Sequence, residues 1–445
     1  MISKDLLVIG GGPGGLVSAM RGAQKGLDVL MAERRDIGGV CLNRGCIPSK
    51  SLKRASDIVY GSESADEMGI NAQISVDYSK TIEWTRNNIG ILTGGMEKRL
   101  KKAGVRIKKS EASFIDSGRA EVGDEEVEFE NCVVATGSSP NQLPFCPFDS
   151  ESVLNSDEFF DLDSLPEKFL VVGAGYIGME IGMICNKLGS EVTILEALDQ
   201  ILPIFDKKTV KPISRKAKEM GMDIKLNRRV DSIESEKGEV EVRTKDGEEY
   251  SAEKVLLVCG RSPNTEGLNL EATDVELTEG GFLRTDDSFR TDDPGIYAVG
   301  DVVGGKMLAH EAYNEAVVAV ESIFGGDVIK SLIPEVVFTD PELARVGEFR
   351  EENRVGEVSL RQVPAAYTKN ELDGQIRVSV DDNDVIKGGE IVGPMASEII
   401  HQIGIAIQNE MKAEDIIETV HAHPTISEGV LLAVEDALDS PVSSL

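Results

Sequence analysis

Residues 6–33, LLVIGGGPGGLVSAMRGAQKGLDVLMAE, decide the fold of this chain. The stretch predicts a strand over residues 6–9, a glycine-rich turn, a helix over residues 16–25 and a second strand over residues 28–32 that ends at Glu33. A strand, a G-x-G-x-x-G turn, a helix, a strand and an acidic residue together form the fingerprint of a dinucleotide-binding α/β unit. The sequence therefore predicts one such unit at its start.

The same pattern occurs again at residues 169–196, FLVVGAGYIGMEIGMICNKLGSEVTILE. In both copies the acidic residue, Glu33 or Glu196, lies 23 positions after the first glycine. We expect this acid to accept hydrogen bonds from an adenosine ribose. The first glycine permits the tight turn, the second lets backbone amides approach a pyrophosphate, and the third lets the helix pack on the strand. These glycines are Gly10, Gly12 and Gly15 in the first copy and Gly173, Gly175 and Gly178 in the second.

A second repeat supports the first. Residues 130–141 read ENCVVATGSSPN and residues 253–264 read EKVLLVCGRSPN, so each is an apolar strand that runs into glycine and then Ser-Pro-Asn. Each dinucleotide fold is therefore expected to close with the same strand and turn. The two halves are interpreted as copies of one domain, of which the first is longer.

The extra length of the first copy includes two cysteines. Cys41 and Cys46 lie in the segment CLNRGCIPSK, residues 41–50. Four intervening residues let two cysteines meet across one turn, and Arg44, Lys50 and the start of a helix would favour a thiolate. Zinc would require two further Cys or His ligands, so no metal site is predicted. The pattern favours a redox-active dithiol.

A dithiol beside two dinucleotide sites implies a particular electron path. A nicotinamide gives two electrons as hydride, whereas a disulfide accepts them through a nucleophilic thiol adduct, and a flavin between the two connects these chemistries. The residues alone thus predict a flavin- and nicotinamide-dependent disulfide oxidoreductase.

Composition excludes other classes of function. The chain has 445 residues, a length typical of two to four domains at ~100–200 residues each. Its 78 acidic and 47 basic side chains give a net charge of −31, which argues against nucleic-acid binding. The apolar run at residues 6–20 is interrupted by glycines and is too short to span a bilayer, and no later run reaches 18 apolar residues. We expect a cytoplasmic protein without membrane partners.

Over nearly its whole length the sequence resembles the two-cysteine pyridine nucleotide-disulfide oxidoreductases. The likeness is carried by residues 38–50, GAGYIGME at 173–180, AVGD at 298–301, MLAH at 307–310, FTDPELARVG at 338–347 and HAHPTISE at 421–428. The resemblance implies an α/β fold with two Rossmann-like dinucleotide-binding domains of three-layer ββα type and a C-terminal α+β dimerisation domain. The expected domains are an FAD-binding domain at 1–145 and 270–330, an NAD-binding domain at 146–269 and an interface domain at 331–445.

The resemblance also implies roles for single residues. Cys46 would lie against the flavin as the charge-transfer thiolate, and Cys41 would be the thiol that attacks the substrate disulfide. Asp301 would contact the ribityl chain of FAD, and Lys50 would pair with Glu180 beside the flavin.

His423 and Glu428 would form an acid/base dyad that reaches the disulfide from the other subunit of a homodimer. Dithiol oxidation needs a base of near-neutral pKa, and a carboxylate that orients the imidazole fixes its tautomer.

The two predicted cofactor sites follow from the same motifs. The FAD site comprises Gly10, Gly12, Pro13, Gly14, Gly15, Glu33, Arg34, Gly39, Val40, Cys41, Cys46, Lys50, Ala112, Ala135, Thr136, Gly137, Gly300, Asp301, Met307, Leu308, Ala309 and His310. The NAD site comprises Gly173, Gly175, Tyr176, Ile177, Gly178, Glu196, Gly260 and Arg261.

Within the family, the motifs are most similar to those of members that catalyse dihydrolipoamide + NAD⁺ ⇌ lipoamide + NADH + H⁺. After the second strand the chain reads Glu196-Ala197-Leu198-Asp199, where a 2′-phosphate would meet two carboxylates, so NAD is favoured over NADP. The expected substrate is a free or protein-bound dihydrolipoyl group, and the expected partner is a 2-oxoacid dehydrogenase or glycine cleavage complex. Two alternatives remain: an NADH-dependent reductase of another small disulfide, and a flavin-binding structural subunit of an acyl-transfer complex.

Overall fold

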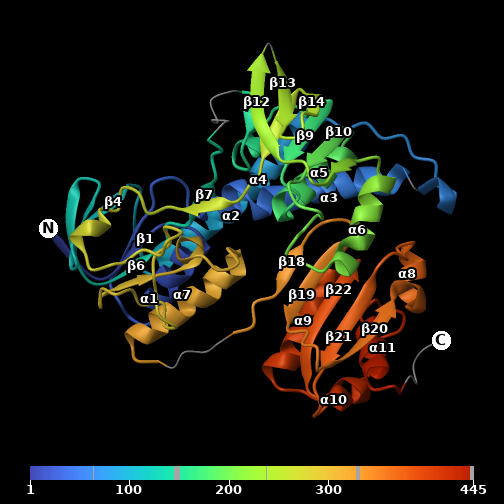
Figure 1. Ribbon diagram of the computed structural model, residues 1–445. Coiled ribbons are helices and arrows are strands. Elements are labelled where there is room, and N and C mark those ends of the chain that lie inside the picture. Colours follow the sequence, from blue (N-terminus) through green and yellow to red (C-terminus); the bar gives the residue numbers. More distant parts are fainter. Residues whose placement is uncertain (64, 145–150, 237, 327–330, 441–445) are drawn as a thin grey trace. The chain divides into compact units, whose positions relative to one another are not determined.

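The structure is a computed structural model (Figure 1), and it describes residues 1–63, 65–144, 151–236, 238–326 and 331–440. The chain divides into two compact units, one of residues 1–165 with 256–330 and one of residues 166–255 with 331–445. The domain boundary predicted between residues 145 and 146 lies outside the described residues.

The first unit is built on one sheet. Within its described residues the strand order is β3-β2-β1-β6-β5-β4, and β17 also pairs with β6. The ladders among β3, β2, β1, β6 and β17 are parallel, whereas β4, β5 and β6 are antiparallel. The strands are β1 (Ile2–Ile9), β2 (Val29–Ala32), β3 (Arg106–Lys108), β4 (Ala112–Asp116), β5 (Arg119–Val122), β6 (Glu125–Val134) and β17 (Ile296–Ala298).

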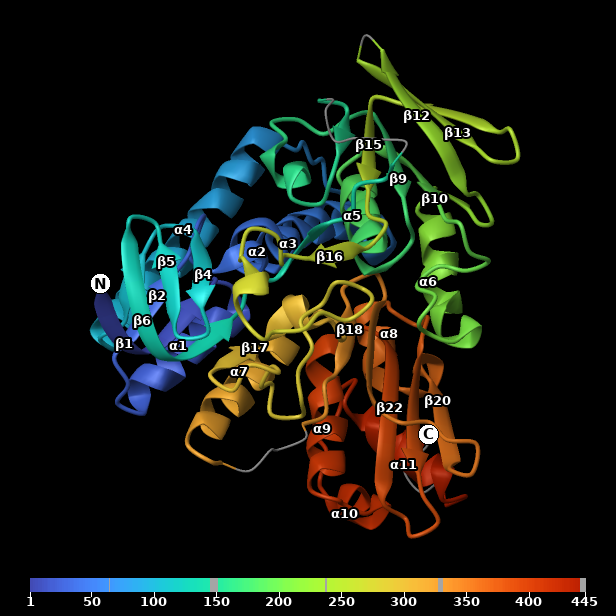
Figure 2. The same cartoon turned by 60° about the vertical axis from the view of Figure 1, so that its left-hand side comes forward.

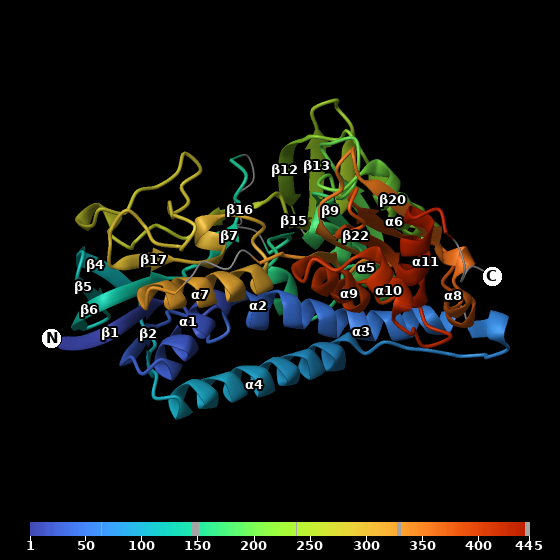
Figure 3. The same cartoon turned by 90° about the horizontal axis from the view of Figure 1, so that it is seen from below.

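The parallel part of this sheet is covered on both faces. Successive side chains of a strand point to opposite faces, and in β1 Leu6 and Val8 join an apolar cluster with helix residues, whereas Leu7 and Ile9 join a cluster with β4 and β5. Figure 3 shows α1 and α7 side by side in the helical layer. The predicted three-layer ββα arrangement is thereby confirmed. The helices are α1 (Pro13–Gln24), α2 (Gly39–Arg44), α3 (Cys46–Glu63), α4 (Tyr78–Lys102) and α7 (Ala309–Ile323).

Short elements complete the first unit. The strands β7 (Ser138–Pro140) and β16 (Arg261–Pro263) form a two-stranded antiparallel ladder. The remaining elements are β8 (Val153–Leu154) and the 3₁₀ turns η1 (Ala65–Met68), η2 (Glu158–Asp161), η3 (Leu270–Ala272) and η4 (Gly300–Val303).

The second unit contains the second predicted fingerprint. The strands β9 and β11 both pair in parallel with β10, and α5 follows β9. A three-stranded antiparallel meander, β12-β13-β14, follows in the sequence, and Figure 2 shows β12 beside β13. The elements are β9 (Lys168–Val172), α5 (Tyr176–Lys187), β10 (Glu191–Leu195), α6 (Lys207–Glu219), β11 (Asp223–Lys225), β12 (Val230–Glu236), β13 (Glu239–Thr244), β14 (Glu249–Ala252) and β15 (Lys254–Leu257).

The C-terminal part of the second unit is an antiparallel sheet with helices, as the predicted α+β domain requires. The described strands have the order β18-β19-β22-β21-β20. A methyl group on Gly356 would lie 1.8 Å from the Ala433 carbonyl oxygen, so glycine is required for α11 to pack directly on β20. The elements are β18 (Glu335–Val337), β19 (Glu342–Gly347), β20 (Arg354–Ser359), η5 (Leu360–Gln362), α8 (Pro364–Lys369), β21 (Gln375–Val380), β22 (Ile386–Gly393), α9 (Ala396–Gln408), α10 (Ala413–Glu418) and α11 (Glu428–Ala437).

Among the described residues, we find no helix that combines the length and the apolar character needed to cross a membrane.

Candidate active site

The first glycine-rich turn lies between β1 and α1 and is held by the carboxylate of Glu33. Oε2 of Glu33 accepts a hydrogen bond of 2.6 Å from the N–H of Gly11, and Oε1 accepts one of 2.6 Å from the N–H of Arg35. Glu33 is 8% exposed. A methyl group on Gly15 would lie 1.9 Å from the Gly10 carbonyl oxygen, so only glycine lets α1 begin this close to the turn.

The second turn, between β9 and α5, repeats this geometry. Oε2 of Glu196 accepts from the N–H of Ala174 at 2.7 Å, and Oε1 accepts from the N–H of Leu198 at 2.8 Å. A methyl group on Gly178 would again lie 1.9 Å from the first glycine's carbonyl oxygen, that of Gly173. Each acid therefore fixes its own turn. The ribose contact expected for both acids stays a prediction. Each carboxylate oxygen accepts one backbone hydrogen bond and has a further lone pair that could accept a bond from a ribose hydroxyl.

Both turns leave room for a diphosphate. A Cβ atom on Gly12 would come no closer than 3.9 Å to another described atom outside its chain neighbours, and one on Gly175 would meet no such atom within 4 Å. The helices α1 and α5, each of 12 residues, begin directly after these glycines. Their first N–H groups and their dipoles favour an anion there. The residues present therefore fit a dinucleotide at each turn.

The two cysteines lie at the junction of α2 and α3, in the first unit. Cys41 is in α2, Gly45 separates the helices, and Cys46 begins α3. The two thiols are hydrogen-bonded to each other, as the predicted meeting across one turn requires. The hydrogen bond with Cys46, together with burial, raises the pKa of the Cys41 thiol far above its usual range, although the charge of Lys50 opposes this.

The expected electrostatic role of Arg44 is wrong. Its guanidinium lies 3.2 Å from Asp36 and 3.3 Å from Asp157, so its charge is balanced by two carboxylates. Arg44 therefore adds little net positive potential at the dithiol, and Lys50 is the cation whose charge lowers the pKa of Cys41.

Tyr313, a residue that the sequence argument missed, belongs to the surroundings of the dithiol. It lies in α7 one helical turn after His310, and its side chain is 40% exposed. Burial raises the pKa of its phenol, and the charges of Cys41 and Cys46 raise it further. The spacing of three residues from His310, on one helix, was the signal that could have pointed to it.

Asp301 lies in a polar network at η4. Its Oδ2 accepts a hydrogen bond of 2.5 Å from the hydroxyl of Ser138, and Arg261 donates to the same hydroxyl at 2.7 Å. The neighbouring N–H of Gly300 donates at 2.5 Å to the carboxylate of Glu315 in α7. Burial raises the pKa of Glu315 to about 7. The sequence predicted Gly300 and Asp301 but neither Ser138 nor Glu315.

The two Ser-Pro-Asn repeats pair with each other, as β7 and β16, in a nearly two-fold arrangement. Ser139 lies opposite Ser262 at the centre of the ladder. The Ser139 hydroxyl donates to the side-chain oxygen of Asn264, and the Ser262 hydroxyl donates to that of Asn141, both at 2.6 Å. Each asparagine N–H also donates to the carbonyl of the other repeat's glycine, at 3.1 and 2.9 Å. This ladder, which we name the Ser-Pro-Asn clasp, joins segments more than 100 residues apart.

The predicted histidine–glutamate pair is present in the second unit. Oε1 of Glu428 accepts a hydrogen bond of 2.9 Å from Nδ1 of His423, and Oε2 accepts one of 2.7 Å from the N–H of Thr425. The His423 side chain is 61% exposed, whereas that of Glu428 is 18% exposed. The carboxylate is thus held by the backbone and fixes the ring through Nδ1, so Nε2 is the ring nitrogen that lies outside this pair.

Glu180 lies in α5, on a helix face that binds the C-terminal sheet of its own unit. Its Oε1 accepts a hydrogen bond of 2.9 Å from the N–H of Phe338. About two helical turns later in α5, Lys187 forms a 2.7 Å ion pair with Asp340. Glu180 is 9% exposed. Its predicted pairing with Lys50, which belongs to the other unit, stays a prediction.

The other predicted FAD residues fall on a few segments of the first unit. Residues 135–137 follow β6, residues 39 and 40 begin α2, and residues 307–310 precede and begin α7. Arg34 lies 3.8 Å from Glu111, and Ala112 is buried in the apolar cluster of β4 and β5.

Two further cysteines are inert structural residues. Cys132 in β6 and Cys185 in α5 are fully buried, and burial raises the pKa of each thiol far above its usual range. Across the described part of the chain, we find no group of three or more Cys, His, Asp or Glu side chains that could hold a metal ion.

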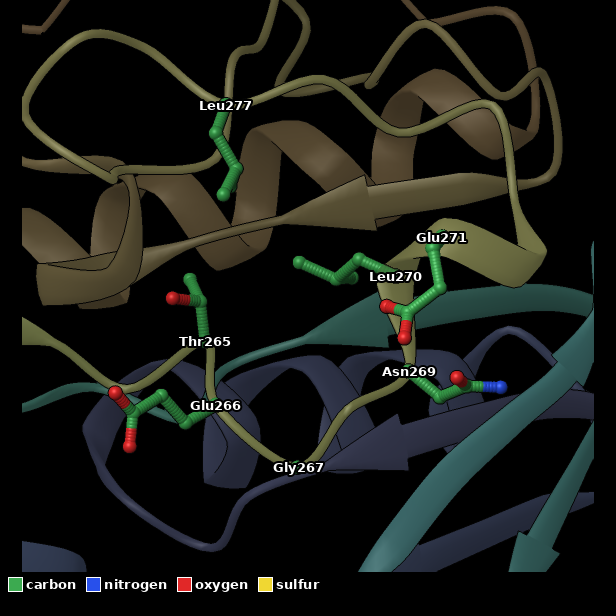
Figure 4. Close-up of a pocket in the computed structure, with 7 residues that line it drawn as sticks. All are labelled: Thr265, Glu266, Gly267, Asn269, Leu270, Glu271 and Leu277. Carbon is green, nitrogen blue, oxygen red and sulfur yellow. The ribbon is translucent and has the colours of Figure 1, made fainter.

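A surface pocket of the first unit is lined by residues that the sequence did not predict as site residues (Figure 4). Thr265, Leu270 and Leu277 contribute to its lining, together with the carboxylates of Glu266 and Glu271. Its two carboxylates make it unsuited to the phosphates of a dinucleotide.

Comparison with known proteins gives consistent matches. The sequence profile of the pyridine nucleotide-disulphide oxidoreductases matches residues 4–316, and that of the dimerisation domain of the same proteins matches residues 333–434. The chain is 42% identical to dihydrolipoyl dehydrogenase 2 of Haloarcula marismortui, covering 96% of this chain and 95% of that protein. It is 40% identical to dihydrolipoyl dehydrogenase of Bacillus subtilis, covering 99% and 98%.

A solved structure agrees with these matches. The crystal structure of LpdA from Mycobacterium tuberculosis superimposes with a TM-score of 0.91 at 28% identity, covering 98% of this chain and 99% of that one.

Proposed function

The chain belongs to the pyridine nucleotide-disulphide oxidoreductase family, and from that premise we propose that it catalyses dihydrolipoamide + NAD⁺ ⇌ lipoamide + NADH + H⁺. The observation that carries the proposal is the hydrogen-bonded pair Cys41 and Cys46, which lies in the same unit as the first dinucleotide turn. The relatives at about 40% identity that are named dihydrolipoyl dehydrogenase support the choice of substrate.

Members of this family use FAD and NAD, and the two turns fit these two cofactors. We assign FAD to the turn held by Glu33 and NAD to the turn held by Glu196. The flavin supplies the carrier that exchanges electrons with a thiol on one side and with a nicotinamide on the other. Asp301 would hold the ribityl chain of FAD.

The cysteines divide the thiol chemistry between them. The resemblance of residues 38–50 to the redox motif of the family assigns the flavin-facing position to Cys46. Cys46 would therefore carry the thiolate, and Cys41 would attack and release the substrate sulfur. Lys50 would stabilise the negative charge of the pair, since its charge lowers the pKa of Cys41.

The residues after the second strand support NAD rather than NADP. Glu196 is 7% exposed and accepts two backbone hydrogen bonds, so it is fixed as a carboxylate acceptor. Asp199 follows and pairs with Lys207 at 2.5 Å, so the nearby cation is already neutralised. A 2′-phosphate at this position would face two carboxylates.

The histidine dyad would move the substrate proton. His423 would take the proton from a dihydrolipoyl thiol at Nε2, and Glu428 would stabilise the imidazolium through Nδ1. The match to the dimerisation domain supports a homodimer. The exposure of His423 is consistent with a dyad that acts on the dithiol of a second subunit.

The setting of the enzyme is part of the proposal. We place it in the cytoplasm, where a protein-bound lipoyl group of a 2-oxoacid dehydrogenase or glycine cleavage complex would be its substrate.

A steady-state comparison tests this function. Purified holoenzyme is assayed with lipoamide, glutathione disulfide and coenzyme A disulfide, each with NADH and with NADPH. We expect the highest kcat/KM for lipoamide with NADH. Cys41→Ser should abolish that activity, and Cys259→Ser, which changes a cysteine outside the pair, should retain it. A higher kcat/KM for either other disulfide, or for NADPH, would replace the proposed substrate or cofactor.

A further inference from the structure

The Ser-Pro-Asn clasp is symmetric except at one position. In the first repeat the residue after glycine is Ser138, whereas in the second repeat it is Arg261. Arg261 therefore places a cation where the symmetry would place a hydroxyl. Its side chain crosses the ladder toward the first repeat.

The contacts of Arg261 in the first unit are directed at Ser138. Nε donates to the Ser138 hydroxyl at 2.7 Å and Nη2 donates to the Ser138 carbonyl oxygen at 2.8 Å. Nη1 lies 3.4 Å from the hydroxyl of Ser156. Ser138 is 4% exposed, so water does not compete strongly for its hydroxyl.

The polarity of these bonds fixes the direction of the network. A guanidinium has donors only, so the Ser138 oxygen must accept from Arg261. The single hydroxyl hydrogen is then left for Asp301, whose Oδ2 accepts it at 2.5 Å. Arg261 also lies 4.0 Å from Oδ2 of Asp301, with side-chain exposures of 14% and 26%. The carboxylate is thereby held on one oxygen, and its other oxygen is free to turn toward a ligand.

We propose that Arg261, although it comes from the second repeat, is a positioning residue for Asp301: through Ser138 it holds this carboxylate in the orientation that receives the ribityl chain of FAD. The inference rests on the proposed function, because it assumes FAD at the first turn. It differs from the role expected for Arg261 in the NAD site.

The consequence is a direct link between the two halves of the duplicated fold. A residue that the sequence assigns to the NAD repeat orders a ligand of the FAD repeat. Loss of Arg261 should let the Ser138 hydroxyl rotate and Asp301 change orientation, so FAD should be held less tightly.

FAD release from the holoenzyme tests the proposal. The rate at which flavin fluorescence appears after dilution is measured for the wild type, Ser138→Ala, Arg261→Ala and the double variant, together with the visible circular dichroism of the bound flavin. Since a hydrogen bond to a charged group is worth about a factor of ten or more, each single variant should release FAD about tenfold faster. Because both residues act through one network, the double variant should release it at nearly the rate of the singles.

Two further variants make the test specific. Arg261→Lys keeps the charge and an N–H donor group but loses the planar fork, so it should restore part of the retention and of the dichroism signal. Ser262→Ala removes a hydroxyl of the same clasp that contacts Asn141 and not Asp301, so it should behave as wild type.

Three results would overturn the proposal. The first is a wild-type rate of FAD release in Arg261→Ala together with a raised KM for NAD⁺. The second is an additive effect, with FAD released about a hundredfold faster from the double variant than from the wild type. The third is an equally fast release of FAD from Ser262→Ala. If Arg261→Ala does not fold, Ser138→Ala and Arg261→Lys still decide between these outcomes. A wild-type protein that binds no FAD at all would instead contradict the proposed function.

Discussion

Glu315 should make the enzyme less stable as the pH rises from about 5 to 8. Its side chain lies in α7, is 6% exposed and accepts a 2.5 Å hydrogen bond from the N–H of Gly300. Burial, with smaller effects from the charges of Glu311 and Asp301, raises the pKa of the carboxyl from 4.5 to about 7. The native state therefore favours the neutral acid.

The sign of the pH dependence follows from proton binding. Between pH 4.5 and about 7 the native state holds a proton that the unfolded state has lost, so the free energy of unfolding falls as pH rises. A change in pKa from 4.5 to about 7 corresponds to about 3 kcal/mol, which is fully expressed above pH 7 and absent below pH 4.5.

The variant Glu315→Gln isolates this effect. The glutamine oxygen can still accept from Gly300, but the side chain is neutral at every pH. Urea unfolding of the FAD-loaded protein should give equal free energies of unfolding for variant and wild type near pH 5. Near pH 8 the free energy of unfolding should be about 3 kcal/mol higher for the variant. Differences between variants are compared because a chain of two compact units with a bound cofactor departs from two-state unfolding.

Glu321→Gln on the same helix is the matched control. Lys25 and Arg21 lower the pKa of Glu321, so its charge stabilises the native state above pH 4.5 and that benefit is lost as pH falls. Its substitution should destabilise the protein at pH 8 and have little effect at low pH, which is the opposite trend. Parallel pH profiles of the wild type and Glu315→Gln would refute the reasoning.

Three other predictions address the chemistry and the charge. Cys41→Ser should keep the reduction of bound flavin by NADH in stopped-flow traces while dihydrolipoamide turnover falls by orders of magnitude; full turnover would exclude its role as the interchange thiol. Glu428→Gln retains an acceptor for the N–H of Thr425 but removes the charge beside His423, so dihydrolipoamide turnover should fall about a hundredfold at unchanged FAD content; unchanged turnover would contradict a dyad. The net charge of −31 should make the native state repel itself. When the KCl concentration is raised from about 0.1 to about 1 M, the screening length shrinks from about 10 to about 3 Å, so the urea concentration at the unfolding midpoint should increase. An unchanged midpoint would show that the self-repulsion is small.

The repeated fingerprints could be predicted from sequence because their determinants are local. In each copy, strand, turn, helix and acid lie within 28 consecutive residues, at 6–33 and 169–196. The predicted strand at 28–32 coincides with β2 over residues 29–32, and the predicted helix at 16–25 coincides with α1 over residues 16–24. The pattern of apolar residues and the glycine spacing within these segments indicate such elements.

The parts that sequence could not predict depend on long-range contacts. Glu33 and Glu196 were expected to face a ribose, and the structure adds that both oxygens of each also hold the turn. Ser138 meets Arg261 from 123 positions away, and no local pattern records that distance. Arg44 was misjudged for the same reason, because its partner Asp157 lies 113 positions along the chain.

The central claim is that Cys41 and Cys46 carry electrons between a lipoyl dithiol and NAD. An anaerobic titration with dihydrolipoamide tests this claim most directly. The oxidised wild-type holoenzyme should develop a long-wavelength absorbance band from a thiolate beside the flavin, and adding NAD⁺ should then remove the band and yield NADH in proportion to the dithiol consumed. Cys46→Ser should bind FAD but develop no such band. A band that persists in Cys46→Ser, or a wild-type protein that reduces NAD⁺ without ever forming it, would contradict the account.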